Sequence, residues 1–150
     1  MGRELPPTPT ATLPLVGAPG WRAVENQLPR LSAEYAVPEE TLRRMLHRYG
    51  DELPDVLAPI RDDAALGFPI TGTAGYLPVE FRRAVTHEGA RTLDDVLARR
   101  THVAIEDPDA GVGAAEEVAA LLAPVLDWDT ARQTEEVAAY EAQPRLATLL

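Results

Sequence analysis

The sequence predicts an all-α fold, a compact orthogonal bundle of about six or seven short helices. Alanine is the commonest residue and leucine the second, and both are strong helix formers, whereas β-branched isoleucine is scarce. Apolar residues recur at helical spacing along most of the 150 residues. Leu, Ile, Val and Phe exceed the roughly 20% below which chains tend to be disordered. One packed helical domain is therefore expected.

The N-terminal end differs from the rest of the chain. Residues 1–20 are rich in proline and carry little periodic pattern. Proline fixes φ and cannot donate a backbone hydrogen bond, so this segment is predicted to be an extended Pro-rich arm or linker. The predicted division is an arm over 1–20, a single helical domain over 21–143 and a C-terminal tail over 144–150.

Three helices are predicted in the first half of the domain. Residues 21–35 form the first, which Pro29 weakens. The second opens at Pro38, ends at Gly50 and carries an apolar stripe at i, i+3, i+4 and i+7 spacing. The third begins after Asp51 and ends or kinks near Pro59. The stripe of the second helix comprises Leu42, Met45, Leu46 and Tyr49.

A glycine-rich loop over 61–75 separates these helices from the second half. Proline and capping residues then mark the helix starts. Pro78 opens a helix that Gly89 ends, and Thr92 caps the next, with Asp95 completing a variant of the capping box. The last two helices are predicted over 114–126, which Pro124 bends or shortens, and from Asp129 to about Ala142.

Charge and cysteine content exclude several functions. The net charge is −10, and all 14 basic residues are arginines. Nucleic-acid binding is disfavoured, because phosphate neutralisation needs a basic surface, and lysine Schiff-base chemistry is excluded. Without cysteine there is no disulfide, thiol nucleophile or thiolate metal site. The absence of cysteine fits a cytoplasmic protein. No apolar run approaches the roughly 18 residues of a transmembrane segment.

No arrangement of residues in the sequence points to catalysis. His47, His87 and His102 are widely separated, and no HExxH, GxSxG, Walker A or GxGxxG motif occurs. Adjacent carboxylates at 62–63 and 94–95 point to different helix faces. The sequence therefore predicts no catalytic, cofactor-binding or metal-binding residue.

Two charges fall on predicted apolar faces. Glu88 lies at the end of the stripe of the 78–88 helix, and Arg100 lies within the stripe of the next helix. A buried charge is costly unless it is paired, so we expect both to be partly buried and satisfied by each other or by a neighbouring chain. The alternative is that the stripe rotates at Gly89 and both reach water. Asp95 and Arg99 are predicted to pair on the helix surface.

Several motifs in order resemble a known family. Residues 86–101, THEGARTLDDVLARRT, are similar to a conserved segment in the C-terminal helical domain of FAD-dependent glycerol-3-phosphate dehydrogenases and glycerophosphate oxidases. LHRYG at 46–50 and EVAAY at 136–140 match further parts of that domain. TLPLVGA at 12–18 resembles the stretch that joins it to the flavin domain. Two departures are Gly89, where the family has a larger residue, and Pro124, within a helix that is usually continuous.

The resemblance implies what this chain does. The full-length enzymes oxidise glycerol 3-phosphate to dihydroxyacetone phosphate and pass electrons through FAD to quinone, peripherally at the inner membrane. Their flavin and substrate groups lie upstream, so no catalytic or cofactor residue carries over, and this chain alone is expected to be inactive. It is expected to pack on the flavin domain of the same or a partner chain, or to form a homodimer. The implied structural or interface residues are Tyr49, Gly50, Glu88, Asp95, Arg99 and Arg100.

Two other interpretations stay open at this point. The first is a free-standing helical protein-interaction module without enzymatic role. The second is a small DNA-binding regulator, in which residues 38–60 mimic a helix-turn-helix. The absence of lysine and the charge of −10 make the regulator the weakest of the three.

Overall fold

The structure is a computed structural model that describes residue 10 and residues 12–143. Within this part of the chain there is no strand, which confirms the all-α class. The predicted tail over 144–150 and residues 1–9 and 11 of the arm lie outside the described residues. The α-helices are α1 Trp21–Glu25, α2 Leu28–Tyr35, α3 Glu39–Tyr49, α4 Leu53–Leu57, α5 Pro78–Thr86, α6 Val103–Glu106, α7 Ala115–Leu126 and α8 Thr130–Glu141.

Shorter helical turns connect these elements. The 3₁₀ turns are η2 Gly50–Glu52, η3 Ala58–Arg61, η4 Ala64–Gly67 and η6 Val112–Ala114, and η5 Asp95–Arg100 is a π-helical turn. The helix expected over 21–35 is divided into α1 and α2, because Pro29 fits the first turn of α2. The helix expected to begin at Thr92 consists of η5 followed by α6.

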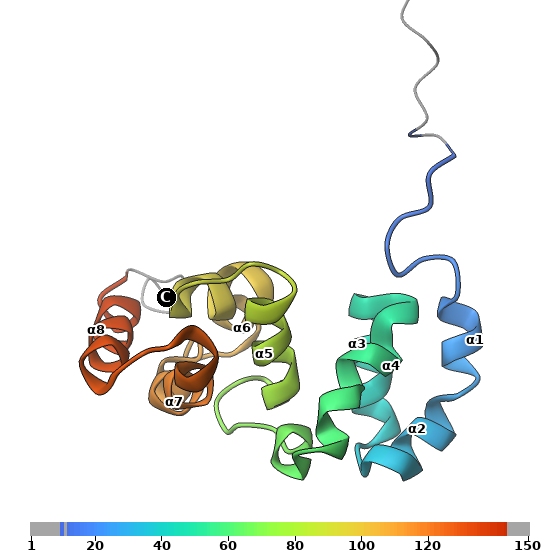
Figure 1. The fold of residues 1–150 in the computed structure, drawn as a ribbon, viewed down its shortest axis with the longest axis horizontal. Helices are drawn as coiled ribbons and strands as arrows, with labels where there is room; N and C mark the ends of the chain where they lie inside the picture. The colour runs from blue at the N-terminus through green and yellow to red at the C-terminus, as the bar shows by residue number, and fades with distance from the viewer. Residues whose placement is uncertain (1–9, 11, 144–150) are drawn as a thin grey trace, which may run out of the picture.

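The helices form two lobes side by side (Figure 1). The first holds α1 to α4, around a core that includes Leu28, Leu42 and Leu57. The second holds α5 to α8, around a core that includes Phe81 and Val118. Contacts of α5 with α4 and η4 join the lobes, and Leu121 of α7 packs against both cores. The two lobes therefore keep separate apolar cores, which Leu121 links.

The arm enters at the top of the first lobe. Residues 12–20 form turns and bends before α1 and run away from the helices in Figure 1. Gly17 accepts a hydrogen bond from the backbone N–H of Asp51 at 2.8 Å, and the N–H of Gly20 donates to the Asp51 carboxylate at 3.1 Å. These bonds fix the last part of the arm against the end of α3.

Candidate functional site

The most deeply buried charge in the described chain is Glu80 of α5, whose exposed fraction is 0%. Its Oε2 accepts the backbone N–H of Leu77 at 2.9 Å, which ties it to the start of its own helix. Arg44 of α3 donates to both carboxylate oxygens, at 2.7 and 3.1 Å, and the Tyr49 hydroxyl donates to Oε1 at 3.4 Å. A bidentate arginine and two further donors make burial of this carboxylate tolerable.

The contacts of Glu80 extend into a network between the lobes. The Arg44 guanidinium lies 4.2 Å from the ring centre of Tyr76. Arg48 of α3 donates to the Tyr76 hydroxyl at 3.3 Å and to the Thr101 carbonyl at 3.1 Å. The Tyr76 hydroxyl donates to Glu106 of α6 at 3.0 Å. We call Arg44, Arg48, Tyr49, Tyr76, Glu80 and Glu106 the interlobe network.

The two tyrosines of the interlobe network are hard to ionise. Burial raises the pKa of Tyr76 to about 12, against the opposing effect of Arg48. Burial also raises the pKa of Tyr49, and the negative charge of Glu80 adds to this effect. The neutral phenols are the forms that donate the hydrogen bonds to Glu106 and Glu80.

Alkaline unfolding should follow from these shifts. In the unfolded chain a tyrosine ionises near pH 10, so the stabilisation is complete below that pH and is lost as the pH rises toward about 12. We expect helical circular dichroism to fall before or together with the rise of tyrosinate absorbance. In Tyr76→Phe, the part of this pH dependence due to Tyr76 should disappear. Ionisation of every tyrosine near pH 10 with full helicity retained would contradict this prediction.

Tyr49 and Gly50 lie where α3 ends and the arm begins its contact. Gly50 has φ 56 and ψ −131, and a Cβ on it would overlap the Gly17 carbonyl oxygen. A Cβ on Gly17 would in turn lie 2.8 Å from the Tyr49 carbonyl oxygen. The close approach of the two backbones therefore requires glycine on both sides.

The structure brings Glu88 and Arg100 together, but not through their side-chain charges. Arg100 is exposed, and its Nε donates to the backbone carbonyl of Glu88 at 2.9 Å. The half-buried Glu88 carboxylate lies 3.9 Å from Nε of Arg83 instead. Arg100 lies in the π turn η5, where the Thr101 N–H donates to the Val96 carbonyl five residues back. The wider turn rotates the face expected from α-helical spacing.

Asp95 and Arg99 form the expected i,i+4 pair, with 2.9 Å between their charged atoms. Arg99 also contacts Asp94 at 2.9 Å. Burial raises the pKa of Asp95, but hydrogen bonds from the Arg91 N–H and Thr92, together with the charge of Arg99, outweigh this and lower the pKa overall. Asp95 thus fixes the start of the segment that carries both arginines, while Arg99 lies on its surface.

Sequence reasoning missed Glu80, although a signal for it exists. Position 80 follows Leu77 by three residues and precedes Ala84 by four, so it falls on the apolar face of its helix. Glu136 also falls on the apolar face of its helix, α8. It is 6% exposed and accepts a hydrogen bond from the Leu93 N–H at 2.8 Å. Checking each stripe for internal charges would have found both.

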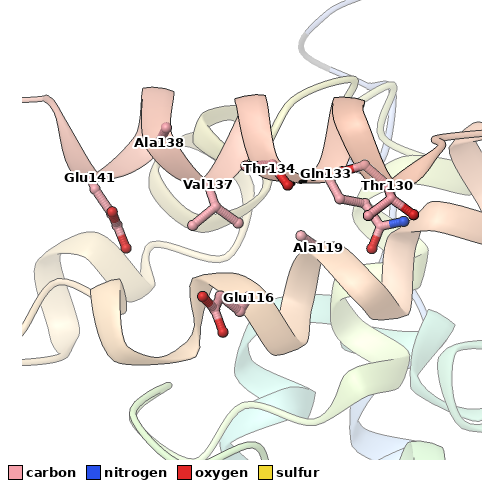
Figure 2. Close-up of a pocket in the computed structure, with 8 residues that line it drawn as sticks. All are labelled: Glu116, Ala119, Thr130, Gln133, Thr134, Val137, Ala138 and Glu141. Atoms are coloured by element: carbon pink, nitrogen blue, oxygen red, sulfur yellow. Dashed lines mark hydrogen bonds between the residues drawn. The ribbon is translucent and has the colours of Figure 1, made fainter.

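A groove of about 340 Å³ lies between α7 and α8 (Figure 2). Ala119 and Val137 form its middle, Thr130 lies toward one end, and Glu116 and Glu141 lie toward the other. Among the described residues that line it, two are carboxylates and none is a cation, which disfavours a phosphorylated ligand there. This groove therefore does not resemble a site for glycerol 3-phosphate.

The contacts described above define a structural class, an all-α domain of two lobes with apolar cores, joined across the buried Glu80 by the interlobe network. Among residue 10 and residues 12–143 no group of three or more metal-ligating side chains occurs. Comparison with known families then places the chain within this class. Residues 8–133 match the family model described as the C-terminal domain of alpha-glycerophosphate oxidase. The chain belongs to this family.

Similar full-length proteins carry the name of a dehydrogenase. Over 137 residues, 91% of this chain, it is 43% identical to "Glycerol-3-phosphate dehydrogenase 2" of Mycobacterium tuberculosis and 44% identical to "Glycerol-3-phosphate dehydrogenase" of Mycobacterium leprae. A 29% match over 85% of the chain is the "Probable glycerol-3-phosphate dehydrogenase, mitochondrial" of Dictyostelium discoideum. The chain spans 23% of the length of the mycobacterial relatives. No solved structure matches it.

The described residues do not fit a site for the FAD that the family implies. A dinucleotide-binding fold places a glycine-rich turn between a strand and a helix, and the described part of the chain contains no strand. Dinucleotide-binding folds hold the pyrophosphate at the N-terminus of a helix. The groove between α7 and α8, with two carboxylates among its described lining residues, offers no comparable site. Likewise, no described helix is long and apolar enough to cross a membrane.

Proposed function

We propose that this chain acts as the non-catalytic C-terminal domain of an FAD-dependent glycerol-3-phosphate dehydrogenase. Oxidation of glycerol 3-phosphate to dihydroxyacetone phosphate, with transfer of electrons to quinone, takes place on the rest of the polypeptide. The helical domain packs on the flavin domain of the same or a partner chain and stabilises the enzyme. The match to a C-terminal domain family, over 23% of the length of dehydrogenase relatives, carries this proposal.

Within this function we assign structural and interface roles to the six residues named from the sequence. Tyr49 and Gly50 hold the end of α3 to Glu80 and to the arm. Asp95 caps the segment that follows α5, and the Glu88 carbonyl binds Arg100. Arg99 and Arg100 are exposed and supply charged contacts to the neighbouring domain or subunit.

The native polypeptide tests the proposed function. Its mass in its own cells should be several times 16.3 kDa, and the purified protein should be yellow and reduce a quinone with glycerol 3-phosphate. We expect it in the cytoplasm, bound peripherally to the inner membrane and released by a salt or alkaline wash. A flavin-free polypeptide near 16.3 kDa would instead support the free-standing interaction module.

Replacing Arg100 by alanine should weaken the assembly of the enzyme while leaving the domain folded. Its one described hydrogen bond is exposed, so the free energy of unfolding should fall by no more than about 1 kcal/mol. In the full-length enzyme the dissociation of domains or subunits should increase, while reduction of the flavin by glycerol 3-phosphate stays unchanged. The matched control is Arg30→Ala, which removes an exposed bond to Gln27. If both variants dissociate to the same extent, Arg100 does not contribute to the interface.

A further inference from the structure

The arm presents apolar side chains to solvent beside a groove. Leu13, Leu15 and Val16 are 63%, 79% and 84% exposed, and Trp21 at the start of α1 is 37% exposed. Leu15, Val16 and Trp21 line a groove of about 400 Å³ between the arm and the end of α3, together with His47, Arg48 and others. We call this surface, residues 15–18, Trp21 and 46–50, the arm groove. Such a cluster of exposed apolar side chains is typical of a contact surface.

The arm groove is held in shape by the backbone. Gly17 and Gly50 meet without space for a side chain, and Asp51 bonds to the backbone of both Gly17 and Gly20. Leu15 and Val16 directly precede this junction, and the Ala18 N–H donates to the Leu15 carbonyl at 3.0 Å, so the turn that carries them is formed before any partner binds. Such pre-organisation reduces the entropy lost on association.

The charge of the arm groove differs from that of the chain as a whole. Of the described residues that line the groove, His47 and Arg48 are basic and none is acidic, and Arg22 lies over the ring of Trp21. The chain as a whole carries −10. The arm groove therefore fits an apolar partner surface that carries carboxylates.

We propose that the arm groove docks on the flavin-bearing part of the same polypeptide. This inference rests on the proposed function, in which the larger part of the enzyme precedes this domain. The arm is the segment nearest to that part along the chain. A surface beside a covalent tether meets its neighbour at high effective concentration, so even a modest apolar contact stays occupied.

Photo-crosslinking in the full-length polypeptide tests this proposal. Val16 is replaced by a photo-crosslinking phenylalanine analogue, and Phe68, which is 64% exposed and does not line the arm groove, is replaced in a control. We expect position 16 to link, within one chain, to residues that precede the arm, and position 68 not to do so. Links of position 16 to a second copy of the chain, seen as a doubled mass, or no links at all, would overturn the proposal.

Charge substitution gives a second readout that does not depend on crosslinking. Leu15→Glu with Val16→Glu should raise hydrogen exchange on both sides of the contact several-fold in the full-length chain, and Phe68→Glu should not. Equal hydrogen exchange in the arm variant and in Phe68→Glu would overturn the proposed docking site. Glycerol-3-phosphate-dependent reduction of quinone is measured separately on the wild type. Its absence would refute the proposed function, whereas the exchange and crosslinks report on the surface itself.

Discussion

Replacing Glu80 by glutamine is expected to lower the free energy of unfolding by about 3 kcal/mol or more. The glutamine is nearly the same size, so the change removes charge and acceptor capacity rather than volume. Arg44, whose side chain is 30% exposed, would lose its bidentate partner, and the Tyr49 hydroxyl and Leu77 N–H would compete for one oxygen. Leaving an uncompensated buried charge costs far more than breaking an exposed pair.

The control for this variant is Glu34→Gln. Glu34 pairs with Arg61 at the surface, and the two side chains are 31% and 60% exposed. Its loss should cost far less than that of Glu80, because water replaces the partner. Chemical denaturation of both variants, followed by helical circular dichroism, measures the difference. Equal costs for Glu80→Gln and Glu34→Gln would show that the interlobe network does not stabilise the fold.

A double-mutant cycle assigns the energy to the pair. Arg44→Gln should also destabilise the fold, because it leaves the Glu80 carboxylate buried with two weaker donors. Since each single variant leaves one unpaired charge, the double variant should cost less than the sum of the two. Additive costs would indicate that the bonds from Tyr49 and Leu77, rather than the pairing with Arg44, determine the contribution of Glu80 to stability.

The helices were predictable because their signals are local. Proline marks the starts of both helices, as the N-cap of α3 and in the first turn of α5, Gly50 marks the end of α3, and apolar spacing gives their buried faces. The interlobe network was not predicted, because Arg44 and Glu80 are 36 residues apart and nothing local pairs them. Only the place of Glu80 on an apolar face could have indicated that it needs a partner.

The π turn shows where spacing arguments fail. Residues 95–100 follow a well-capped start, so α-helical periodicity was extended through Arg100. In the structure the buried Thr101 hydroxyl donates to the Val96 carbonyl at 2.7 Å, alongside its N–H. Arg48 from α3 then donates to the freed Thr101 carbonyl. Tertiary bonds therefore stabilise the wider turn, and they expose Arg100 where the sequence pattern had placed it on the apolar face.

Replacing Gly50 by alanine is expected to detach the arm and to lower the free energy of unfolding by about 2–4 kcal/mol. The pair φ 56, ψ −131 lies outside the small left-handed region open to L residues, so alanine is strained there even without a neighbour. The new Cβ would also overlap the Gly17 carbonyl oxygen. Because that atom belongs to the backbone, no side-chain rotation relieves the overlap, and the arm itself has to move.

Gly89→Ala distinguishes strain from overlap. Gly89 has φ 73, but a Cβ there meets nothing within 4 Å, so its cost should stay near the roughly 1–2 kcal/mol of left-handed strain. The Asp51 amide provides the second readout, since its N–H donates to the Gly17 carbonyl. Its hydrogen exchange should accelerate in Gly50→Ala and stay slow in Gly89→Ala. If the Asp51 amide stays protected in Gly50→Ala, the two backbones separate without releasing the arm, and the arm groove keeps its shape without this glycine contact.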